Sequence, residues 1–507
     1  MRRLKHAAVL LACVLPLSAG ACGGGDDSSS ALDAALAYLP ADAPFAVALD
    51  TDLDGEQYEA VDSLLGKFPL GVESVEDALA DQLSGGEDDV DFREDVKPLL
   101  GNPFVVGASD ASSFTGDGED DFVAAIQVAD ADALDRLIDK TKPNESGEQS
   151  GATVYEDGGT IFAIEGDVVV FAGSESLLSR ALERADGDDH LDGETFDGAL
   201  DGLPGDDLAR VYADVAALLE SDPDTRSARK VEWVGALRTL GMTVAAHRDG
   251  VEIDFNLRTE GEELSEGDLP IAEGPDSPGV LERDGEVGFG IRDLAQVVRF
   301  AEAAGQAIDP AGYGDYLKAK KTLDSRLGIS IDDDLIGQFT EDVAASAAVD
   351  GKFGLRAEIR DPGAFEETLA KVAGVLPSFA EGAGFGAVTL EKPKGGGDFY
   401  TLAQADGDAV VFGVSGGAFV LANDAERARE LASAEPARVE GAEGAVAMKA
   451  DAESLVAAFI TRFGPELGLS GLGGLAAPLF IRSLEDLTGS IESSTDGLHG
   501  RLALGVD

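Results

Sequence analysis

The chain has 507 residues, of which 98 are Asp or Glu and 38 are Lys or Arg, so its formal charge at pH 7 is −60. A surface this acidic repels nucleic acid and anionic lipid headgroups, which argues against DNA, RNA or peripheral binding to an anionic membrane. Hydrophobic residues make up 44% of the chain, enough to bury the cores of about two domains.

The N-terminal segment has the pattern of a bacterial signal peptide. The opening MRRLK supplies three positive charges, and the apolar run at residues 7–17 is too short to span a membrane. Small residues then lead to Cys22 in the order Ala-Gly-Ala-Cys, which resembles the lipobox of bacterial lipoproteins, with Ala19 where Leu is usual. In such proteins the cysteine thiol is diacylated and the cysteine becomes the new N-terminus.

We therefore expect residues 1–21 to be a lipoprotein signal peptide, Cys22 to be the lipidation site and residues 22–33 to be a flexible tether. Ordinary secretory cleavage after Ala21 is the alternative. Cys13 is removed with the signal peptide, so a lipidated Cys22 leaves no thiol for a disulfide, a metal or a nucleophile. The expected location is the extracytoplasmic face of the bacterial cell membrane, with the membrane as a partner through the lipid.

The first predicted strand, at residues 45–50, leads into a segment that begins like a calcium-binding loop. Asp50, Asp52 and Asp54 alternate and a glycine follows, as at the start of an EF-hand. The twelfth position of such a loop needs a bidentate Glu, and this sequence has Val61 there. Three neighbouring carboxylates repel one another without a cation, so calcium stays a weak candidate, and no other cofactor is expected.

The same segment has a simpler interpretation as the start of a helix. Asp54 is followed three residues later by Gln57, which favours an N-cap at Asp54. A helix beyond that cap would place Tyr58, Val61 and Leu64 on one face. We therefore predict that the three aspartates are capping or solvated acids, and we expect no catalytic residue in this loop.

Further along the first half, helices and hairpins alternate. Residues 131–140 place Leu134, Leu137 and Ile138 on one stripe, which predicts an amphipathic helix. Two turn pairs divide residues 153–173 into three antiparallel strands, and an Asp-Gly pair turns a hairpin within residues 242–258. This alternation indicates an α+β fold with mainly antiparallel strands, arranged as a meander plus hairpins and interleaved with amphipathic helices.

The second half repeats the first. Four segments that begin at residues 126, 168, 210 and 242 match, in the same order, segments that begin at 357, 418, 447 and 487. An acidic stretch rich in Gly and Pro joins the two sets. We predict two tandem homologous halves, a first α+β repeat at 34–258 and a second at 281–507, joined by a linker at 259–280. Whether the halves share one sheet stays open.

Polar residues that favour helix starts recur where predicted strands meet predicted helices. Their side-chain oxygens can accept hydrogen bonds from free N–H groups of the first turn, worth about 1 kcal/mol each. The second-half counterpart of Asp54 and Gln57 is Asp293 with Gln296, and Asn423 with Glu426 predicts a capping box. The remaining predicted caps are Asp130, Ser174, Asp214, Asp361 and Asp451.

The remaining motifs give only weak evidence for a catalytic, metal or ligand site. Ser415 lies in a G-x-S-x-G sequence, but strands are predicted on both sides, whereas a nucleophile elbow needs a helix after the serine. His190, His247 and His499 lack the spacing of a zinc site, and no acid pair stands out as that of a glycosidase. The Gly-rich, apolar residues 466–481 favour a loop and helix packed on the core over an apolar lip that binds a lipid or a partner.

Residues 38–69 contain a Leu-Pro-Ala-Asp-Ala-Pro turn, a strand and an acidic DTD-x-DG segment. In these features the chain resembles the actinobacterial envelope proteins of the domain of unknown function 3352 family, and the likeness extends over both halves. The resemblance implies a secreted, often lipid-anchored protein. It implies no activity, substrate or catalytic residue.

Three functions stay open at this point. The expected one is a non-enzymatic, lipid-anchored cell-envelope protein that presents a binding or assembly surface to an unknown protein or apolar ligand. A carrier of an apolar ligand or lipid is the first alternative, and a large apolar cavity would favour it. An extracytoplasmic hydrolase is the second, and a histidine within hydrogen-bond reach of Ser415 would favour it.

Overall fold

The computed structural model describes residues 26–69, 72–83, 90–110, 122–157, 159–221, 223–260, 264–378, 388–393, 399–404, 409–463 and 481–507. The chain divides into two compact units. Unit 1 comprises Met1–Arg226, Ala236–Glu260 and Val506–Asp507, and unit 2 comprises Ser227–Gly235 and Gly261–Gly505. The short segment Ser227–Gly235 thus groups with unit 2, although its place in the sequence is within the first predicted repeat.

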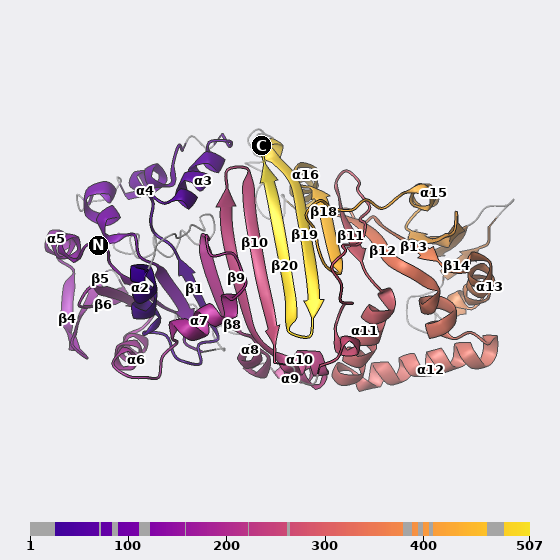
Figure 1. The fold of residues 1–507 in the computed structure, drawn as a ribbon, viewed down its shortest axis with the longest axis horizontal. Coiled ribbons are helices and arrows are strands. Elements are labelled where there is room, and N and C mark those ends of the chain that lie inside the picture. The colour runs from indigo at the N-terminus through magenta and orange to yellow at the C-terminus, as the bar shows by residue number, and fades with distance from the viewer. Residues whose placement is uncertain are drawn as a thin grey trace. The chain divides into compact units, whose positions relative to one another are not determined.

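Unit 1 is built on a large antiparallel sheet (Figure 1). In the order in which they pair, its described strands are β4 (Asn144–Gln149), β5 (Ala152–Asp157), β6 (Thr160–Glu165), β7 (Val168–Ala172), β3 (Phe122–Gln127), β2 (Phe104–Ala108), β1 (Phe45–Leu49), β8 (Ala209–Asp214), β9 (Leu237–His247) and β10 (Gly250–Thr259). The predicted meander within residues 153–173 is β5, β6 and β7, and the predicted hairpin at 242–258 lies within β9 and β10.

The helices of unit 1 come between these strands, as the alternating pattern predicted. They are α2 (Asp26–Leu36), α3 (Glu56–Leu65), α4 (Val75–Leu83), α5 (Ala131–Thr141), α6 (Glu175–Ala185), α7 (Gly193–Leu200), α8 (Val215–Ser221) and α9 (Pro223–Arg226). A π-helical turn at Phe92–Val96 and a 3-10 turn at Lys97–Leu99 precede β2.

Side chains on opposite faces of this sheet enter two separate cores, because successive residues of a strand point to opposite sides. Val168 and Val170 of β7 pack with α2, α6 and α7, whereas Val169 between them packs with α5. Leu134 of α5 is buried, and Leu137 and Ile138 pack against the same core, as their predicted stripe requires. Helices therefore cover both faces of the sheet.

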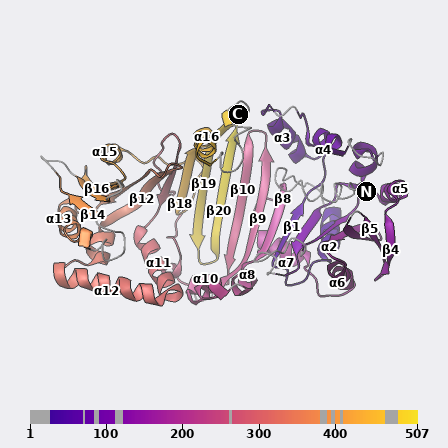
Figure 2. The same ribbon diagram turned by 180° about the vertical axis from the view of Figure 1, so that it is seen from behind.

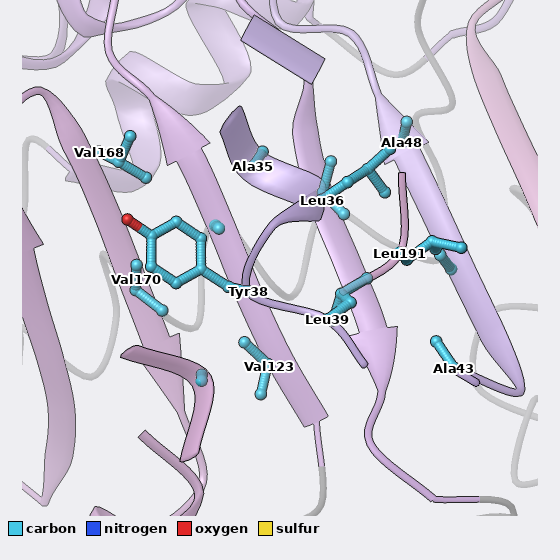
Figure 3. Packing of buried hydrophobic residues seen from close by; sticks show 14 of the residues in the cluster. Ala35, Leu36, Tyr38, Leu39, Ala43, Ala48, Val123, Val168, Val170 and Leu191 are labelled. Carbon is cyan, nitrogen blue, oxygen red and sulfur yellow. The ribbon is translucent and has the colours of Figure 1, made fainter. Parts of the chain in front are cut away.

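The turn before β1 anchors the first of these cores. Tyr38 and Leu39 are almost fully buried beside Leu36 and Val123 (Figure 3). The Tyr38 hydroxyl donates a hydrogen bond to Glu165 at 2.8 Å. A Cβ atom at Gly107 of β2 would overlap the side chain of Leu39, so only glycine permits this close packing.

β4 has a different character from the inner strands. Its residues Asn144–Gln149 are mostly exposed and polar, and among the described strands it pairs only with β5. The register between the two strands shifts between Glu145 and Gly147. This bulge bends a strand that carries little apolar surface.

The described strands of unit 2 pair in the corresponding order (Figure 2). They are β14 (Val388–Glu391), β15 (Phe399–Gln404), β16 (Ala409–Ser415), β17 (Ala418–Ala422), β13 (Phe353–Ile359), β12 (Phe339–Ala348), β11 (Glu286–Ile291), β18 (Val446–Asp451), β19 (Leu484–Ser494) and β20 (Gly497–Val506). The described helices are α10 (Glu232–Ala236), α11 (Leu294–Ile308), α12 (Pro310–Leu327), α13 (Pro362–Ala373), α15 (Ala425–Ser433) and α16 (Ala452–Phe463).

Two cores also flank the sheet of unit 2. Leu431 of α15 packs with Val411 and Val420, and Phe365 of α13 packs with Phe412. Antiparallel sheets covered by helices place both units in the α+β class, as predicted. Among the described helices, none combines the length and the apolar content that a membrane crossing needs.

Candidate functional site

The acidic loop that begins like a calcium site connects β1 to α3. The Oδ1 atom of Asp50 accepts a hydrogen bond from the N–H of Asp52 at 2.9 Å, and Oδ1 of Asp52 accepts from the N–H of Asp54 at 3.2 Å. These contacts make two successive Asx turns. The carboxylate of Asp54 forms an ion pair with the Lys97 ammonium at 2.8 Å. Across the described residues, no three His, Cys, Asp or Glu side chains group in a metal-binding arrangement.

The prediction that Asp54 caps the following helix is wrong. The N-cap residue of α3 is Gly55, and no side chain caps it. The Asp54 carboxylate is directed to Lys97 instead, because an ion pair is available there. Gln57, its predicted capping partner, is buried; it donates to the carbonyl of Asp206 at 3.0 Å and accepts from the N–H of Ala246 at 2.8 Å.

The corresponding prediction in unit 2 is confirmed. Asp293 caps α11, because its Oδ1 accepts from the N–H groups of Ala295 at 3.0 Å and Gln296 at 3.3 Å. The Gln296 side chain is buried, like that of Gln57, and donates to the carbonyl of Leu269 at 2.6 Å. Both glutamines therefore tie the first turn of a helix to backbone that is distant in sequence.

Most of the other predicted caps are also confirmed. Asp130, Ser174, Asp214, Asp361 and Asp451 each accept a hydrogen bond from the N–H three residues further on.

The capping box at Asn423 is wrong by one residue. Asp424 caps α15 through bonds from the N–H groups of Glu426 and Arg427, and its negative charge suits the helix N-terminus. Asn423 instead accepts from the N–H of Phe353 at 3.1 Å and donates to the Gly351 carbonyl, which needs an amide.

A buried carboxyl close to Asp50 had no sequence signal. Asp207 is only 3% exposed and precedes β8, the strand that pairs with β1. Burial raises the pKa of Asp207 to about 7, and Asp206 and Asp50 add to this effect, whereas Arg210 opposes it. The Nε atom of Arg210 lies 3.7 Å from Oδ1 of Asp207. Sequence reasoning missed this group because it stands in a loop outside any motif.

Ser415, His190 and His247 lie in turns or at strand ends, whereas His499 is half-buried within β20. Ser415 ends β16 and pairs with Ala418 of β17 across a two-residue glycine turn, so the predicted hairpin is confirmed and the strand–turn–helix of a nucleophile elbow is not formed. His190 Nδ1 lies 3.0 Å from the Gly187 carbonyl oxygen, and His247 is exposed at the end of β9. Cys22 and residues 466–480 lie outside the described residues.

Unit 2 contains a buried ion pair that the sequence also did not indicate. The Arg427 guanidinium of α15 forms two parallel hydrogen bonds with the Glu286 carboxylate of β11, and Nη2 of Arg427 donates to Ser346 at 2.8 Å. The side chains of Arg427 and Glu286 are 4% and 7% exposed. Burial disfavours the charged carboxylate, but these hydrogen bonds hold the pKa of Glu286 below its usual range.

A charged pocket of about 580 Å³ lies at the start of α11 in unit 2. Three arginines from separate segments line it, namely Arg292 after β11, Arg360 after β13 and Arg438 after α15. Three aspartates line it too, and one of them is Asp293, whose backbone is left-handed with φ of 46°. Irregular backbone of this kind is frequent at binding sites. This pocket is our candidate functional site.

The arginines of this pocket keep much of their hydrogen-bonding capacity, because each guanidinium has five N–H donors. Arg292 uses Nη1 to donate to the Glu273 carbonyl at 3.2 Å, and Arg438 lies 3.6 Å from an Asp276 oxygen. The Arg360 side chain contacts no ion-pair or hydrogen-bond partner within the described ranges. Arginine stays charged throughout the physiological pH range, so these groups can bind an anion but cannot transfer a proton.

The model of the family described as "Protein of unknown function (DUF3352)" matches residues 6–354, which is more than half of the chain. The chain belongs to that family. The DUF3352 match confirms the resemblance drawn from residues 38–69, and no curated protein matches the chain.

Solved structures of TP0453 are among the matches, in crystal forms I, III and IV. Form III is 12% identical over 46% of this chain and 82% of that chain, with a TM-score of 0.26. Form IV is 14% identical over 44% of this chain and 80% of that chain, with the same TM-score. Likeness at this level assigns no function to this DUF3352 protein.

Proposed function

We propose that this DUF3352 protein is a non-enzymatic, lipid-anchored protein of the bacterial cell envelope that binds a ligand or partner. The single observation that carries the location is the N-terminal sequence, in which a basic segment and a short apolar run precede Cys22. On this proposal, residues 1–21 are removed, Cys22 carries the lipid, and the two units are held at the extracytoplasmic face of the membrane.

The chemistry of the candidate site supports binding over catalysis. Its cationic groups are arginines, which hold charge without exchanging protons near neutral pH. Ser415, the candidate nucleophile of the hydrolase alternative, sits at a hairpin end and not in an elbow. Half of the residues that line the described pocket are charged, which suits a polar ligand better than the apolar ligand of the carrier alternative.

We further propose that the two units descend from one duplicated ancestor. The described strands of each unit pair in the same order, and equivalent hydrogen bonds recur. One example is the N–H of Ala129 donating to Leu99 O in unit 1, which corresponds to the N–H of Arg360 donating to Gln338 O in unit 2. Superposition of residues 34–258 on 281–507 in an experimental structure tests this origin, and a failure to superpose would contradict it.

The proposed function is tested by expressing the whole chain in a bacterium with a radiolabelled fatty acid. We expect label on the wild-type protein and recovery in the membrane fraction, and no label on a Cys22→Ser variant. Cys13→Ser is the matched control and should be labelled normally. Capture of binding partners from solubilised membranes with the anchored form then addresses the binding role. A wild-type protein that takes up no label would contradict the anchor.

A further inference from the structure

We infer that the pocket at the start of α11 binds a phosphate group. This inference rests on the proposed binding function and specifies its ligand class. The pocket lies within unit 2 and has a volume of about 580 Å³, enough for a small organic phosphate. Arg292, Arg360 and Arg438 line it, and three aspartates balance their charge, so the arginines would hold a phosphate through directed N–H donors and not through a net positive charge.

Three arginines in one pocket are unexpected in this chain. Acidic residues outnumber basic ones by 98 to 38, so a cationic side chain on this surface ordinarily has a carboxylate close by. Arg360 nevertheless has no side-chain partner among the described residues, and Arg438 reaches only an exposed aspartate at 3.6 Å. Exposed ion pairs of this kind contribute little to stability, so they do not account for the arginines.

The architecture of the fold does not require these arginines either. Arg292 directly follows β11, and the corresponding residue after β1 in unit 1 is Asp50. Arg360 corresponds to Ala129, because both residues donate their N–H groups to equivalent carbonyls after the same strand. Unit 1 therefore forms the same strand junctions without a basic residue at either position.

The number and origin of the arginines favour phosphate over carboxylate. A carboxylate offers two coplanar oxygens, which one guanidinium satisfies with two parallel hydrogen bonds. A phosphate group has three or four oxygens that point in different directions, so guanidinium groups from separate segments can each reach one. The N-terminus of α11 is not the binding group here, because the Asp293 carboxylate already accepts from its N–H groups.

The test measures binding by isothermal titration calorimetry to the whole chain carrying Cys22→Ser, which removes the proposed lipid. The probes are inorganic phosphate, glycerol 3-phosphate and citrate, at low salt. We expect both phosphates to bind and citrate to bind more weakly. Arg360→Gln and Arg292→Gln should each weaken phosphate binding about tenfold or more, since each removes a charge-assisted contact. Arg429→Gln changes an exposed arginine of α15 outside the pocket and should have no effect.

Vesicles distinguish the source of the phosphate. Binding to phosphatidylglycerol vesicles that depends on Arg360 indicates a lipid headgroup, whereas binding to glycerol 3-phosphate alone indicates a soluble ester. Both results support a phosphate site. Wild-type affinity in both pocket variants, tighter binding of citrate, or no binding of either phosphate overturns the inference. Fatty-acid labelling at Cys22 and partner capture are measured independently, so the proposed function survives the loss of this site.

Discussion

The side chain of Gln57 accepts a hydrogen bond from the N–H of Ala246 at 2.8 Å, across 189 positions of sequence. Its amide nitrogen also donates to the carbonyl of Asp206 at 3.0 Å. Both ends of one buried amide are therefore satisfied by backbone groups outside α3. This residue connects α3 with the part of the sheet formed by β8 and β9.

Replacing Gln57 with Leu should destabilise unit 1 by about 2–3 kcal/mol, because the N–H of Ala246 is then left buried without an acceptor. Urea denaturation followed by circular dichroism measures the loss. Gln306→Leu is the matched control, since Gln306 is exposed on α11, and it should change stability by less than about 0.5 kcal/mol. Equal losses of unfolding free energy in the two variants would show that the buried amide of Gln57 stabilises the protein no more than an exposed one.

The Arg427–Glu286 ion pair predicts a strongly asymmetric response to substitution. Arg427→Met should cost about 3 kcal/mol of unfolding free energy, because it leaves the buried Glu286 carboxylate with the partly exposed Arg283 guanidinium, 3.4 Å away, as its remaining counter-charge. The double variant Arg427→Met with Glu286→Leu should recover most of that loss, since no buried charge then remains. Denaturation curves of the single and double variants decide the matter, and a double variant less stable than Arg427→Met would refute this account.

The buried Asp207 predicts a pH-dependent stability. Its pKa of about 7 in the folded state is above the usual value near 3.9. Between these two pH values the folded protein therefore retains a proton that the unfolded chain has released. The contribution of this group to stability is therefore fully present below pH 4 and is lost as pH rises through 7. By linkage the loss is about 2–4 kcal/mol.

The measurement compares the wild-type protein with Asp207→Asn, because the asparagine stays neutral at every pH. The difference in unfolding free energy between them should increase from pH 5 to pH 8, in favour of the variant. Comparing the pair cancels the general repulsion among the other acidic groups, which also grows with pH. A difference that is constant over this range would mean that Asp207 titrates normally.

The loop after β1 should not depend on calcium. Its carboxylates are engaged by backbone N–H groups and by Lys97, so a cation would have to displace these contacts. We expect the thermal unfolding midpoint of the whole chain to be the same, within about 1 °C, in excess calcium and in chelator. The paired variant Asp50→Asn with Asp52→Asn should give the same result. A rise of the wild-type midpoint with calcium, abolished in the variant, would restore the metal hypothesis.

Local signals in the sequence predicted the local structure well. Asp130 and Asp361 cap helices as expected, because an acid before an amphipathic run needs only its own neighbours to form that bond. The capping roles predicted for Asp54 and Asn423 were wrong because distant groups compete for their side chains. The competitor is Lys97 for Asp54 and the backbone of β13 for Asn423. The local sequence pattern could not indicate those partners, because they are distant in sequence.

The candidate site could not be predicted from the sequence for a related reason. Arg292, Arg360 and Arg438 stand tens of residues apart and share no motif. The pairing of β11, β12 and β13 brings the segments of Arg292 and Arg360 together, and a bridge between Val280 and Ala437 places the segment of Arg438. Asp207 comes close to Asp50 in the same way, through the pairing of β1 with β8. Periodicity indicates which side chains face a core, but it does not indicate which loops meet.

The polar, bulged β4 has a consequence for the behaviour of the protein in concentrated solution. A flat apolar strand in this position would offer its free N–H and C=O groups as a template for another chain. β4 instead presents glutamates and a kink, which oppose the docking of a like-charged neighbour. Growth of fibrils or stacked sheets from this end of unit 1 is therefore disfavoured, even where many copies are crowded together.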